Sequence, residues 1–329
     1  MTTPFELDIA AQPEALATFV ATPIPEGLGS VLTGQYDRIV LTGMGSSHFA
    51  AIGTWRRIVA TGRPAWWIDS GQLLDAPELV TPGTLLIATS QSGASGEVVA
   101  LLADCSPAAI VGVTNGADSP LGRRSDVVID LCSGPEATVS TKSYLNTLAA
   151  QQVIADMITN SSATDPTAAL AAVADFTVPD FLGAVAADIA VPGARLAYIG
   201  FGDHAATSLY SGLITKEGAK IPSDGYAGGQ FRHGPLELAG PGLTAVLFDG
   251  ASVTPSARQL AEDLLATGST VVSVGAGESA THRISGPSTP LAQLVHGALV
   301  AQHLTVAVAR GRGITPGAFA YGSKVTSSL

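Results

Sequence analysis

The sequence predicts an α/β protein of two domains, each a parallel sheet between two layers of helices. Short apolar runs alternate with segments of helical spacing, as in proteins where each strand is followed by a crossover helix. Hydrophobic residues make up 46% of the chain and charged residues 13%, which suits buried sheets covered by helices. A length of 329 residues allows two domains of ordinary size.

Five short apolar runs in the first half are bounded by Gly, Pro, Asp or Ser, which is typical of buried strands. They are Arg38–Leu41, Ala65–Ile68, Thr84–Ala88, Ala109–Val113 and Val127–Leu131. The segments with helical spacing between and after them are Phe49–Val59, Gly96–Ala103 and Tyr144–Ile158. This alternation predicts a parallel sheet with helices on both faces.

A second cycle of the same kind follows in the other half. Its predicted strands are Arg195–Gly200, Leu243–Phe248 and Thr270–Val274, and its predicted helices are Thr207–Ala219, Ser256–Ala266 and Ala292–Ala309. The halves resemble each other in architecture more than in residues, which indicates a duplicated fold.

The polar stretch Thr159–Thr167, which contains Asp165-Pro166, predicts a break between the halves. We expect a first domain over residues 1–160 with an N-terminal helix, a linker over 161–178 and a second domain over 179–312. Residues 313–329 have no periodicity and should form a tail that must dock to be ordered.

Composition and charge argue against several classes of function. The net charge of −11 makes a broad surface for nucleic acid or anionic membranes unexpected. The apolar segment Ala292–Ala309 contains glutamines and histidines, so a buried helix fits it better than a membrane span. The first residues lack the basic and apolar regions of a signal peptide. We therefore expect a soluble, cytoplasmic protein.

The cysteines and histidines predict neither a metal site nor a disulfide framework. Cys105 and Cys132 have no metal spacing. His282, His296 and His303 have no ligand spacing with carboxylates or cysteines. We expect no metal and no other cofactor.

A loop of small and hydroxyl residues follows the first predicted strand and includes Gly45, Ser46 and Ser47. Small residues at a strand-to-helix turn let backbone N–H groups approach an anion, and the helix N-terminus adds a partial positive charge. A dinucleotide-binding loop would need a third glycine where His48 stands, although Asp69 near the next strand would suit it. A plain tight turn explains the loop equally well.

Two further polar loops favour ligand binding over a plain turn. Residues 90–95 (Ser-Gln-Ser-Gly-Ala-Ser) follow the strand predicted at Thr84–Ala88, at the end where open α/β sheets bind ligands. Residues 138–143 precede the helix predicted at Tyr144–Ile158. Helix capping by Ser92 or Ser95 would need only one of these hydroxyls. Three such loops together favour a phosphate or phosphosugar ligand.

In this order, Gly45–Ser47, Ser90–Ser95 and Ser140–Lys142 resemble the three phosphosugar-binding segments of the tandem SIS (sugar isomerase) domain family. The resemblance runs from Phe5–Pro13 to Lys324, and members include the isomerase half of glucosamine-6-phosphate synthase. It implies two tandem three-layer αβα SIS domains with a C-terminal tail that closes the active site. The phosphosugar-binding residues that it implies are Gly45, Ser46, Ser47, Ser90, Gln91, Ser92, Ser95 and Ser140.

A carboxylate and an imidazole lie in the second half. Glu217 falls near the end of a mostly apolar predicted helix, and His233 follows the loose pair Gly228-Gly229. Such a pair could transfer a proton at a carbon next to a carbonyl and open a sugar ring. From the residues alone, a solvated charge beside Lys216 and a turn histidine are the favoured explanation.

The family resemblance reverses that preference and implies three catalytic residues. Glu217 would be the base that moves a proton between C1 and C2. His233 would assist ring opening, donated across a homodimer interface. Lys324, in a Lys-Val-Thr tail, resembles the lysine that helps to open the ring and can form an imine with the ketose C2 carbonyl. Such a lysine needs a desolvated pocket.

The sequence also departs from the family pattern. Ile214 stands where the synthase has a second lysine, three residues before the glutamate, and this leaves the proton relay open. Gln230 and Arg232 replace a glutamate and a lysine. We expect no glutaminase domain before residue 1, and hence no internal supply of ammonia.

The expected function is therefore an enzyme acting on an amino-sugar or ketose phosphate. The reaction would be an aldose–ketose isomerisation coupled to deamination or deglycation, for example between glucosamine 6-phosphate and fructose 6-phosphate. The alternative is a non-catalytic, phosphosugar-binding regulatory protein with the same fold. Ile214 keeps that alternative open, whereas a sensor would need neither Glu217 nor Lys324.

Overall fold

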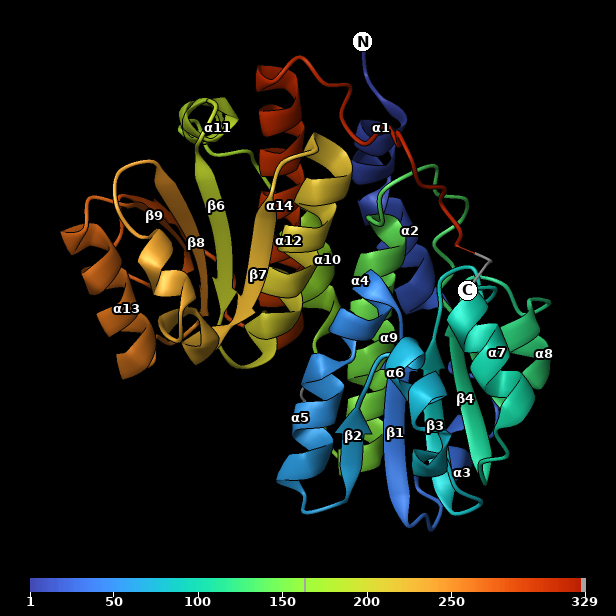
Figure 1. Cartoon of the computed structure of the whole chain (residues 1–329). Helices are drawn as coiled ribbons and strands as arrows, with labels where there is room; N and C mark the ends of the chain where they lie inside the picture. Colours follow the sequence, from blue (N-terminus) through green and yellow to red (C-terminus); the bar gives the residue numbers. More distant parts are fainter. Residues whose placement is uncertain (163, 327–329) are drawn as a thin grey trace. The chain divides into compact units, whose positions relative to one another are not determined.

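The computed structural model describes residues 1–162 and 164–326 and contains two sheets of five strands each (Figure 1). Residue 163, in the expected linker, and residues 327–329, in the expected tail, lie outside the described residues. Neighbouring strands of both sheets are paired in parallel, so the predicted α/β class with two parallel sheets is confirmed.

Backbone packing divides the chain into two units that interleave along the sequence. The second-sheet unit contains residues 1–13, 137–141 and 165–320, and the first-sheet unit contains residues 14–136, 142–164 and those from Tyr321 on. The sequence predicts consecutive blocks as domains, whereas the packing groups the first residues with the second sheet and the last ones with the first sheet.

The first sheet has the strand order β2-β1-β3-β4-β5. Its strands are β1 (Arg38–Gly43), β2 (Ala65–Trp67), β3 (Thr84–Thr89), β4 (Ala109–Thr114) and β5 (Val127–Asp130). Each lies within two residues of a predicted apolar run, because strands buried on both faces need continuous apolar sequence.

Helices cover both faces of this sheet, since successive strand residues point to opposite sides. Ile39 and Leu41 of β1 pack on one helical layer, and Val40 between them packs on the other. The first layer consists of α3 (Leu28–Leu32), α5 (Ile52–Ala60) and α9 (Lys142–Thr159). The second consists of α6 (Ser70–Asp75), α7 (Gly96–Asp104) and α8 (Pro120–Arg124). The three-layer arrangement follows from this alternation.

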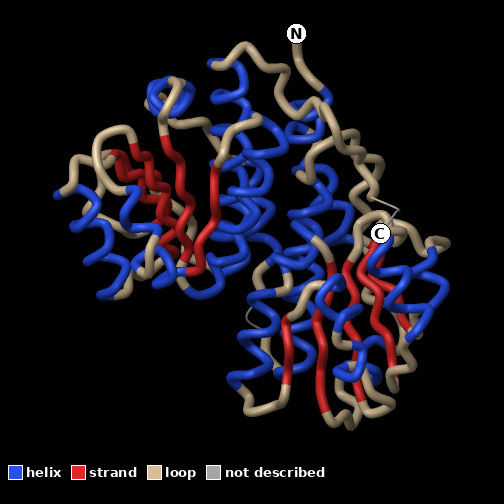
Figure 2. Tube along the Cα trace, viewed as in Figure 1, coloured by secondary structure: helices blue, strands red, loops and turns tan. Residues whose placement is uncertain are grey.

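The second sheet has the order β10-β9-β8-β6-β7. Its strands are β6 (Arg195–Gly200), β7 (Ser223–Ala227), β8 (Leu243–Gly250), β9 (Thr270–Gly275) and β10 (His282–Ile284). Helix α13 (Pro255–Ala266) and the short helix η3 (Gly228–Arg232) pack on one face through Leu260 and Phe231. Helices α12 (Ala205–Ala219) and α14 (Pro290–Gly311) lie on the other face (Figure 2).

Several elements of the structure are not predicted by the sequence pattern. The edge strand β7 reads Ser-Asp-Gly-Tyr-Ala and has no apolar run, because it pairs only with β6. The helices α10 (Pro166–Ala174) and α11 (Leu182–Ala190) pack on α14. Asp165-Pro166, interpreted as part of a break, begins α10: the Asp165 side chain accepts the Ala168 N–H at 3.0 Å.

Helix α14 is the one described helix with the length and composition of a membrane span. Its most apolar window is 78% buried inside the protein. That degree of burial is typical of a core helix, in agreement with the prediction for Ala292–Ala309.

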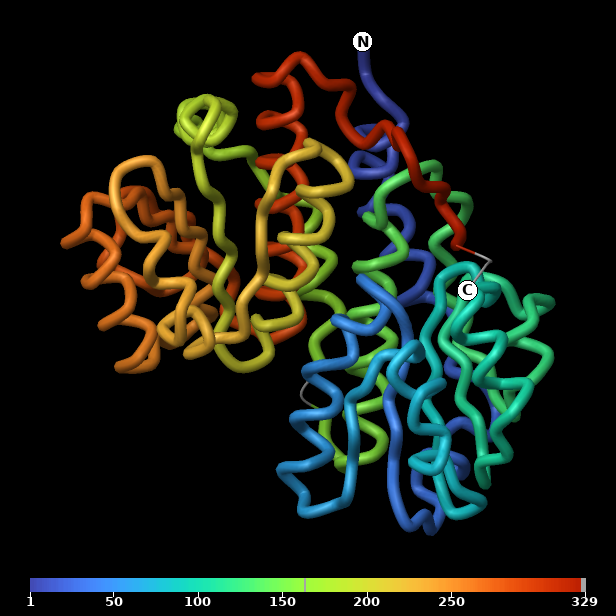
Figure 3. Tube along the Cα trace, in the orientation of Figure 1, coloured from blue at the N-terminus to red at the C-terminus, as the bar shows by residue number. Residues whose placement is uncertain are grey.

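The first residues of the protein are held by a buried network of hydrogen-bonded polar side chains. Helix α1 (Pro4–Ala10) packs on α14 (Figure 3), and Gln12 begins α2 (Gln12–Ala21). The Gln12 and Gln302 side chains exchange hydrogen bonds of 2.8 and 3.0 Å. The Gln302 amide also donates to Tyr210 Oη at 2.9 Å, and that hydroxyl donates to the Ser140 carbonyl at 2.7 Å. This buried network joins residues 1–13 and 137–141 to helices α12 and α14 of the same unit.

His48 illustrates a second buried polar group, in the first-sheet unit. Its ring is stacked on Trp67 at 4.1 Å, and its Nδ1 atom has no partner among the described residues. Burial lowers the pKa of His48 to about 4, against a smaller opposing effect of Asp69. The His48 side chain therefore packs on Trp67 in the folded protein.

Replacing Gln302 by Leu should lower the free energy of unfolding by about 1–3 kcal/mol, because the Gln12 amide loses its buried partner. Urea denaturation measures the change. Gln259→Leu, at an exposed position of α13, is the matched control and should change stability by less than about 0.5 kcal/mol. Equal effects of the two variants on the free energy of unfolding would contradict a stabilising role for the buried network.

Acid should destabilise the protein between pH 6.5 and 4. The folded state keeps His48 neutral down to a pKa of about 4, whereas the unfolded chain takes up the proton near 6.5. His48 thus contributes full stability above pH 6.5, and up to about 3 kcal/mol is lost as the pH falls. Burial also lowers the pKa of His204, His296 and His303, which adds in the same direction.

The test is the free energy of unfolding of His48→Phe, measured from pH 7 to 4. The phenyl ring can stack on Trp67 and does not titrate. The free energy of unfolding should therefore fall less between pH 7 and 4 than it does in the wild type. Exposed His233→Gln should keep the wild-type pH dependence. If His48→Phe lost as much stability in acid as the wild type, His48 would not be the cause of the acid destabilisation.

Candidate functional site

The first two hydroxyl-rich loops follow neighbouring strands of the first sheet. Gly43 at the end of β1 is paired with Thr89 at the end of β3, in parallel register. The loops after β1 and β3 therefore both leave the sheet at its carboxyl edge, where open α/β sheets bind ligands. The structure brings the segments Gly45–Ser47 and Ser90–Ser95 to one edge of one unit.

The backbone of the first loop is compact because two glycines permit it. A Cβ atom on Gly43 would lie 2.6 Å from the Thr89 carbonyl oxygen, and Gly45 adopts a φ of +52°. Gly45 begins the short helix α4 (Gly45–Ala50), which carries Ser46 and Ser47 on its first turn. Neither serine hydroxyl has a hydrogen-bond partner within residues 1–162 and 164–326, so both groups are available to a ligand.

The second loop is closed by a contact between its own ends. Ser90 is 2% exposed, and its Oγ lies 2.9 Å from Ser95 Oγ. Ser95 occupies the N-cap position of α7, but its side chain makes no capping hydrogen bond. Ser92 Oγ accepts the Ala94 N–H at 3.2 Å, and half-buried Gln91 accepts the Asn115 N–H at its carbonyl. Capping of α7 therefore does not explain the serines.

Gly93 is required at the turn of this loop. It has a φ of +63°, and a Cβ atom there would lie 1.9 Å from Ser119 Oγ. A larger residue would push the loop away from the N-cap of α8, where the Ser119 hydroxyl accepts the Gly122 N–H. The glycine thus fixes the position of the hydroxyls on either side of it.

The third loop spans the change from one unit to the other. Ser140 lies in the second-sheet unit, where its carbonyl accepts the Tyr210 hydroxyl at 2.7 Å. Its side chain, which the family resemblance implies for phosphosugar binding, is partly exposed. Lys142, the first residue of α9, lies in the first-sheet unit and donates to the Pro135 carbonyl at 2.7 Å.

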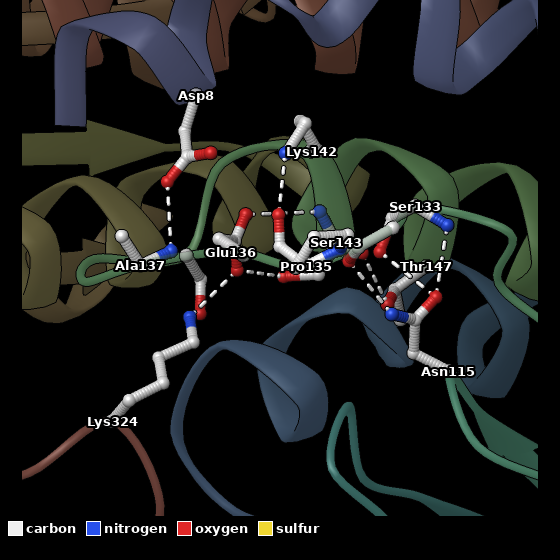
Figure 4. A network of polar contacts seen from close by, with 12 residues as sticks. Asp8, Asn115, Ser133, Pro135, Glu136, Ala137, Lys142, Ser143, Thr147 and Lys324 are labelled. Atoms are coloured by element: carbon white, nitrogen blue, oxygen red, sulfur yellow. Dashed lines mark hydrogen bonds and ion pairs between the residues drawn. The ribbon is translucent and has the colours of Figure 1, made fainter. Parts of the chain in front are cut away.

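Glu136 is a functional candidate that the sequence pattern does not reveal. Its carboxylate has an exposed fraction of 0% and accepts Ser143 Oγ at 2.5 Å and the Ser143 N–H at 3.2 Å. Lys324 Nζ lies 2.6 Å from Glu136 Oε2 (Figure 4). The signal in the sequence is weak, because Glu136 stands in an irregular segment and its partner is 188 positions away.

Lys324 belongs to the segment from Tyr321 to Thr326, which contains no helix or strand. Its side chain is 19% exposed, so most of it is shielded from solvent. The Thr326 carbonyl accepts the N–H of Gly96, the first residue of α7, at 3.0 Å. The segment therefore docks on the first-sheet unit, next in sequence to the Ser90–Ser95 loop.

Glu217 lies on the last turn of α12 in the second-sheet unit, half-buried. Lys216 beside it is exposed and pairs with Asp224 at 2.9 Å. Ile214, at the position of the family lysine, is fully buried. Lys220 follows the helix with a φ of +55°, and its ammonium donates to the Glu217 carbonyl.

Lys220 thus brings its ammonium group close to Glu217, whereas the Lys216 ammonium is paired with Asp224. Burial lowers the pKa of Lys220, and the Glu217 carboxylate opposes this shift. The sequence does not favour Lys220 for this place, because its approach depends on the left-handed backbone at the end of the helix. A cation therefore lies close to the candidate base although position 214 is apolar.

His233 follows η3 in the same unit as Glu217 and is exposed. Its neighbour Arg232 pairs with Asp263 of α13 at 2.7 Å. Within the described part of the chain, no group of three or more His, Cys, Asp or Glu side chains is arranged to hold a metal ion.

The SIS domain family matches residues 34–157, which include the first sheet with the loops of Gly45–Ser47 and Ser90–Ser95. The glutamine–fructose-6-phosphate aminotransferase (isomerizing) of Pyrococcus horikoshii is 26% identical over 329 residues, covering 91% of this chain and 54% of that protein. The chain spans about half the length of the curated relatives it matches.

Two solved structures show the same fold. The C-terminal domain of glucosamine-fructose-6-phosphate aminotransferase from Francisella tularensis has a TM-score of 0.80 at 17% identity, with 96% of this chain and 98% of that one covered. A glucosamine-6-phosphate deaminase from Thermotoga maritima has a TM-score of 0.76 at 22% identity, with 98% and 99% covered.

These likenesses agree with the two parallel sheets and with the loops at the edge of the first one. Residues 34–157 of the chain match the SIS domain family, and the chain is homologous to the isomerase part of the glutamine–fructose-6-phosphate aminotransferases.

Proposed function

We propose that this chain is a phosphosugar isomerase-type enzyme that acts on an amino-sugar or ketose phosphate. The reaction couples aldose–ketose isomerisation to loss of nitrogen as ammonia or as an amine. The names of the relatives, an isomerizing aminotransferase and a glucosamine-6-phosphate deaminase, support this substrate class. The observation that carries the proposal is the pair of hydroxyl-rich loops at the carboxyl edge of the first sheet.

In this proposal the loops bind the phosphate. Ser46 and Ser47 offer hydroxyls and the first-turn N–H groups of α4, and the Ser90–Ser95 loop offers Ser and Gln side chains. Neutral donors suit a protein with a net charge of −11, because the ligand is attracted by nearby dipoles rather than by the overall charge.

The proposed chemistry needs one base and two proton-transferring groups. Glu217 removes the proton from C2 of the open-chain aldose and returns it to C1, so that the C2 amine becomes an imine that water hydrolyses. His233 and Lys324 act on the ring oxygen and the carbonyl during ring opening. Lys220, beside Glu217, supplies a positive charge in place of the lysine missing at Ile214. A homodimer and a cytoplasmic location stay predictions.

Replacing Ser92 by Ala should weaken sugar-phosphate binding about tenfold or more, because a hydrogen bond to a charged phosphate is lost. Isothermal titration with fructose 6-phosphate gives the dissociation constant. Ser30→Ala, an exposed serine on α3 of the same unit, is the control and should bind as the wild type does. Equal affinity of Ser92→Ala and the wild type would remove this loop from the phosphate site.

Glu217→Gln should lower turnover by about 100-fold or more, since a general base contributes 10²–10⁴ in rate, while ligand binding is retained. The substrates to test are glucosamine 6-phosphate, galactosamine 6-phosphate, a fructosyl-amino-acid 6-phosphate, and fructose 6-phosphate with ammonium. Ammonia and sugar products are measured. Glu237→Gln, an exposed glutamate of the same unit, is the matched control with wild-type turnover.

The outcomes separate two classes of function. Turnover retained in Glu217→Gln would rule out the base assignment. Saturable binding of these ligands without turnover by the wild type would favour the non-catalytic, phosphosugar-binding protein instead.

A further inference from the structure

The last described residues of the chain are held by two contacts to the first-sheet unit. One is the ion pair of 2.6 Å between Lys324 Nζ and Glu136 Oε2 (Figure 4). The other is the hydrogen bond of 3.0 Å from the Gly96 N–H to the Thr326 carbonyl. We call residues 321–326 the docked tail. It has no regular secondary structure, so these contacts fix its path.

Glu136 is built to receive a cation. An ionised carboxylate with no exposed surface is costly unless it is paired and hydrogen-bonded. Both oxygens are engaged: Oε1 accepts the Ser143 N–H, while Oε2 accepts Ser143 Oγ and the Lys324 ammonium. Ser143 lies on the first turn of α9, where a nearby negative charge is favourable. The rigid end of α9 therefore holds the carboxylate in place.

Both anchors lie at the edge that carries the candidate phosphate loops. Gly96 follows Ser95 directly, and Glu136 follows β5, the last strand of the same sheet. The parallel strands place the segments after β3 and β5 at the carboxyl edge. The tail thus delivers an amino group to the edge from which the first two loops offer hydroxyls.

We propose that Glu136 is a positioning residue for Lys324: it docks the tail and fixes the amino group at the carboxyl edge of the first sheet. The carboxylate does not act on the sugar. It restricts Lys324, whose side chain would otherwise sample many rotamers in water. The catalytic part of this inference rests on the proposed function, whereas the docking of the tail does not.

The docking is tested without any substrate, by hydrogen exchange of the Gly96 amide. That N–H is protected by the Thr326 carbonyl, so release of the tail exposes it to exchange. We expect Glu136→Gln and Lys324→Gln each to speed exchange at Gly96 by about tenfold or more. Lys324→Gln keeps both Ser143 hydrogen bonds to the Glu136 carboxylate and retains an amide donor at position 324, so it gives the answer if Glu136→Gln fails to fold.

The matched control is Lys216→Gln, which removes a lysine–aspartate pair whose side chains are 48% and 64% exposed. It should leave exchange at Gly96 unchanged. Wild-type exchange in both Glu136→Gln and Lys324→Gln would overturn the docking role, whatever the activity.

The positioning role is tested by a double-mutant cycle on turnover. If Glu136 acts only through Lys324, Glu136→Gln lowers kcat when Lys324 is present. It causes no further loss of kcat when Lys324 is already replaced by Gln. Losses that multiply would show that Glu136 acts independently and would overturn the inference. If the wild type turns over none of the tested sugars, the proposed function fails, and the exchange experiment still decides the docking.

Discussion

Parallel strand pairing is the constraint on which the rest of this structure depends. Each strand must be followed by a connection that returns to the opposite edge, so helices cover both faces and central strands such as β3 and β4 are buried throughout. The same geometry sends the chain out at one edge after every strand. The hydroxyl loops after β1 and β3 meet there because their last residues, Gly43 and Thr89, are paired.

Positive φ angles and small residues then set the detail of that edge. Gly43 and Gly93 stand where a Cβ atom would meet a neighbouring carbonyl or hydroxyl. They bring the backbone closer than any other residue could, so that serine side chains lie on a compact frame. The docked tail adds a segment that is far away in sequence, held through a buried carboxylate rather than through strand pairing.

Much of the fold is predictable because its signal is local. The strands buried on both faces leave continuous apolar runs, and the serine loops stand directly after two of them. Edge strand β7 has no such run, since half of its environment is solvent. Helix α10 is hidden in a stretch whose Asp-Pro pair reads as a break but caps a helix.

The candidate site is less predictable from the sequence. The role of Glu136 depends on a lysine 188 positions away, and no local pattern encodes that pairing. Lys220 reaches Glu217 only because the chain turns left-handed after α12. Sequence resemblance identifies Glu217, His233 and Lys324 as candidates, but their neighbours come from the three-dimensional arrangement.

The buried pair of Gln12 and Gln302 has a consequence for how the protein is made. The two residues are 290 positions apart, so the ribosome releases the first almost a whole chain before the second. Until α14 emerges, helix α1 lacks the helix on which it packs. Helix α1 is therefore among the first segments made and among the last to reach its packing partner in the folded unit.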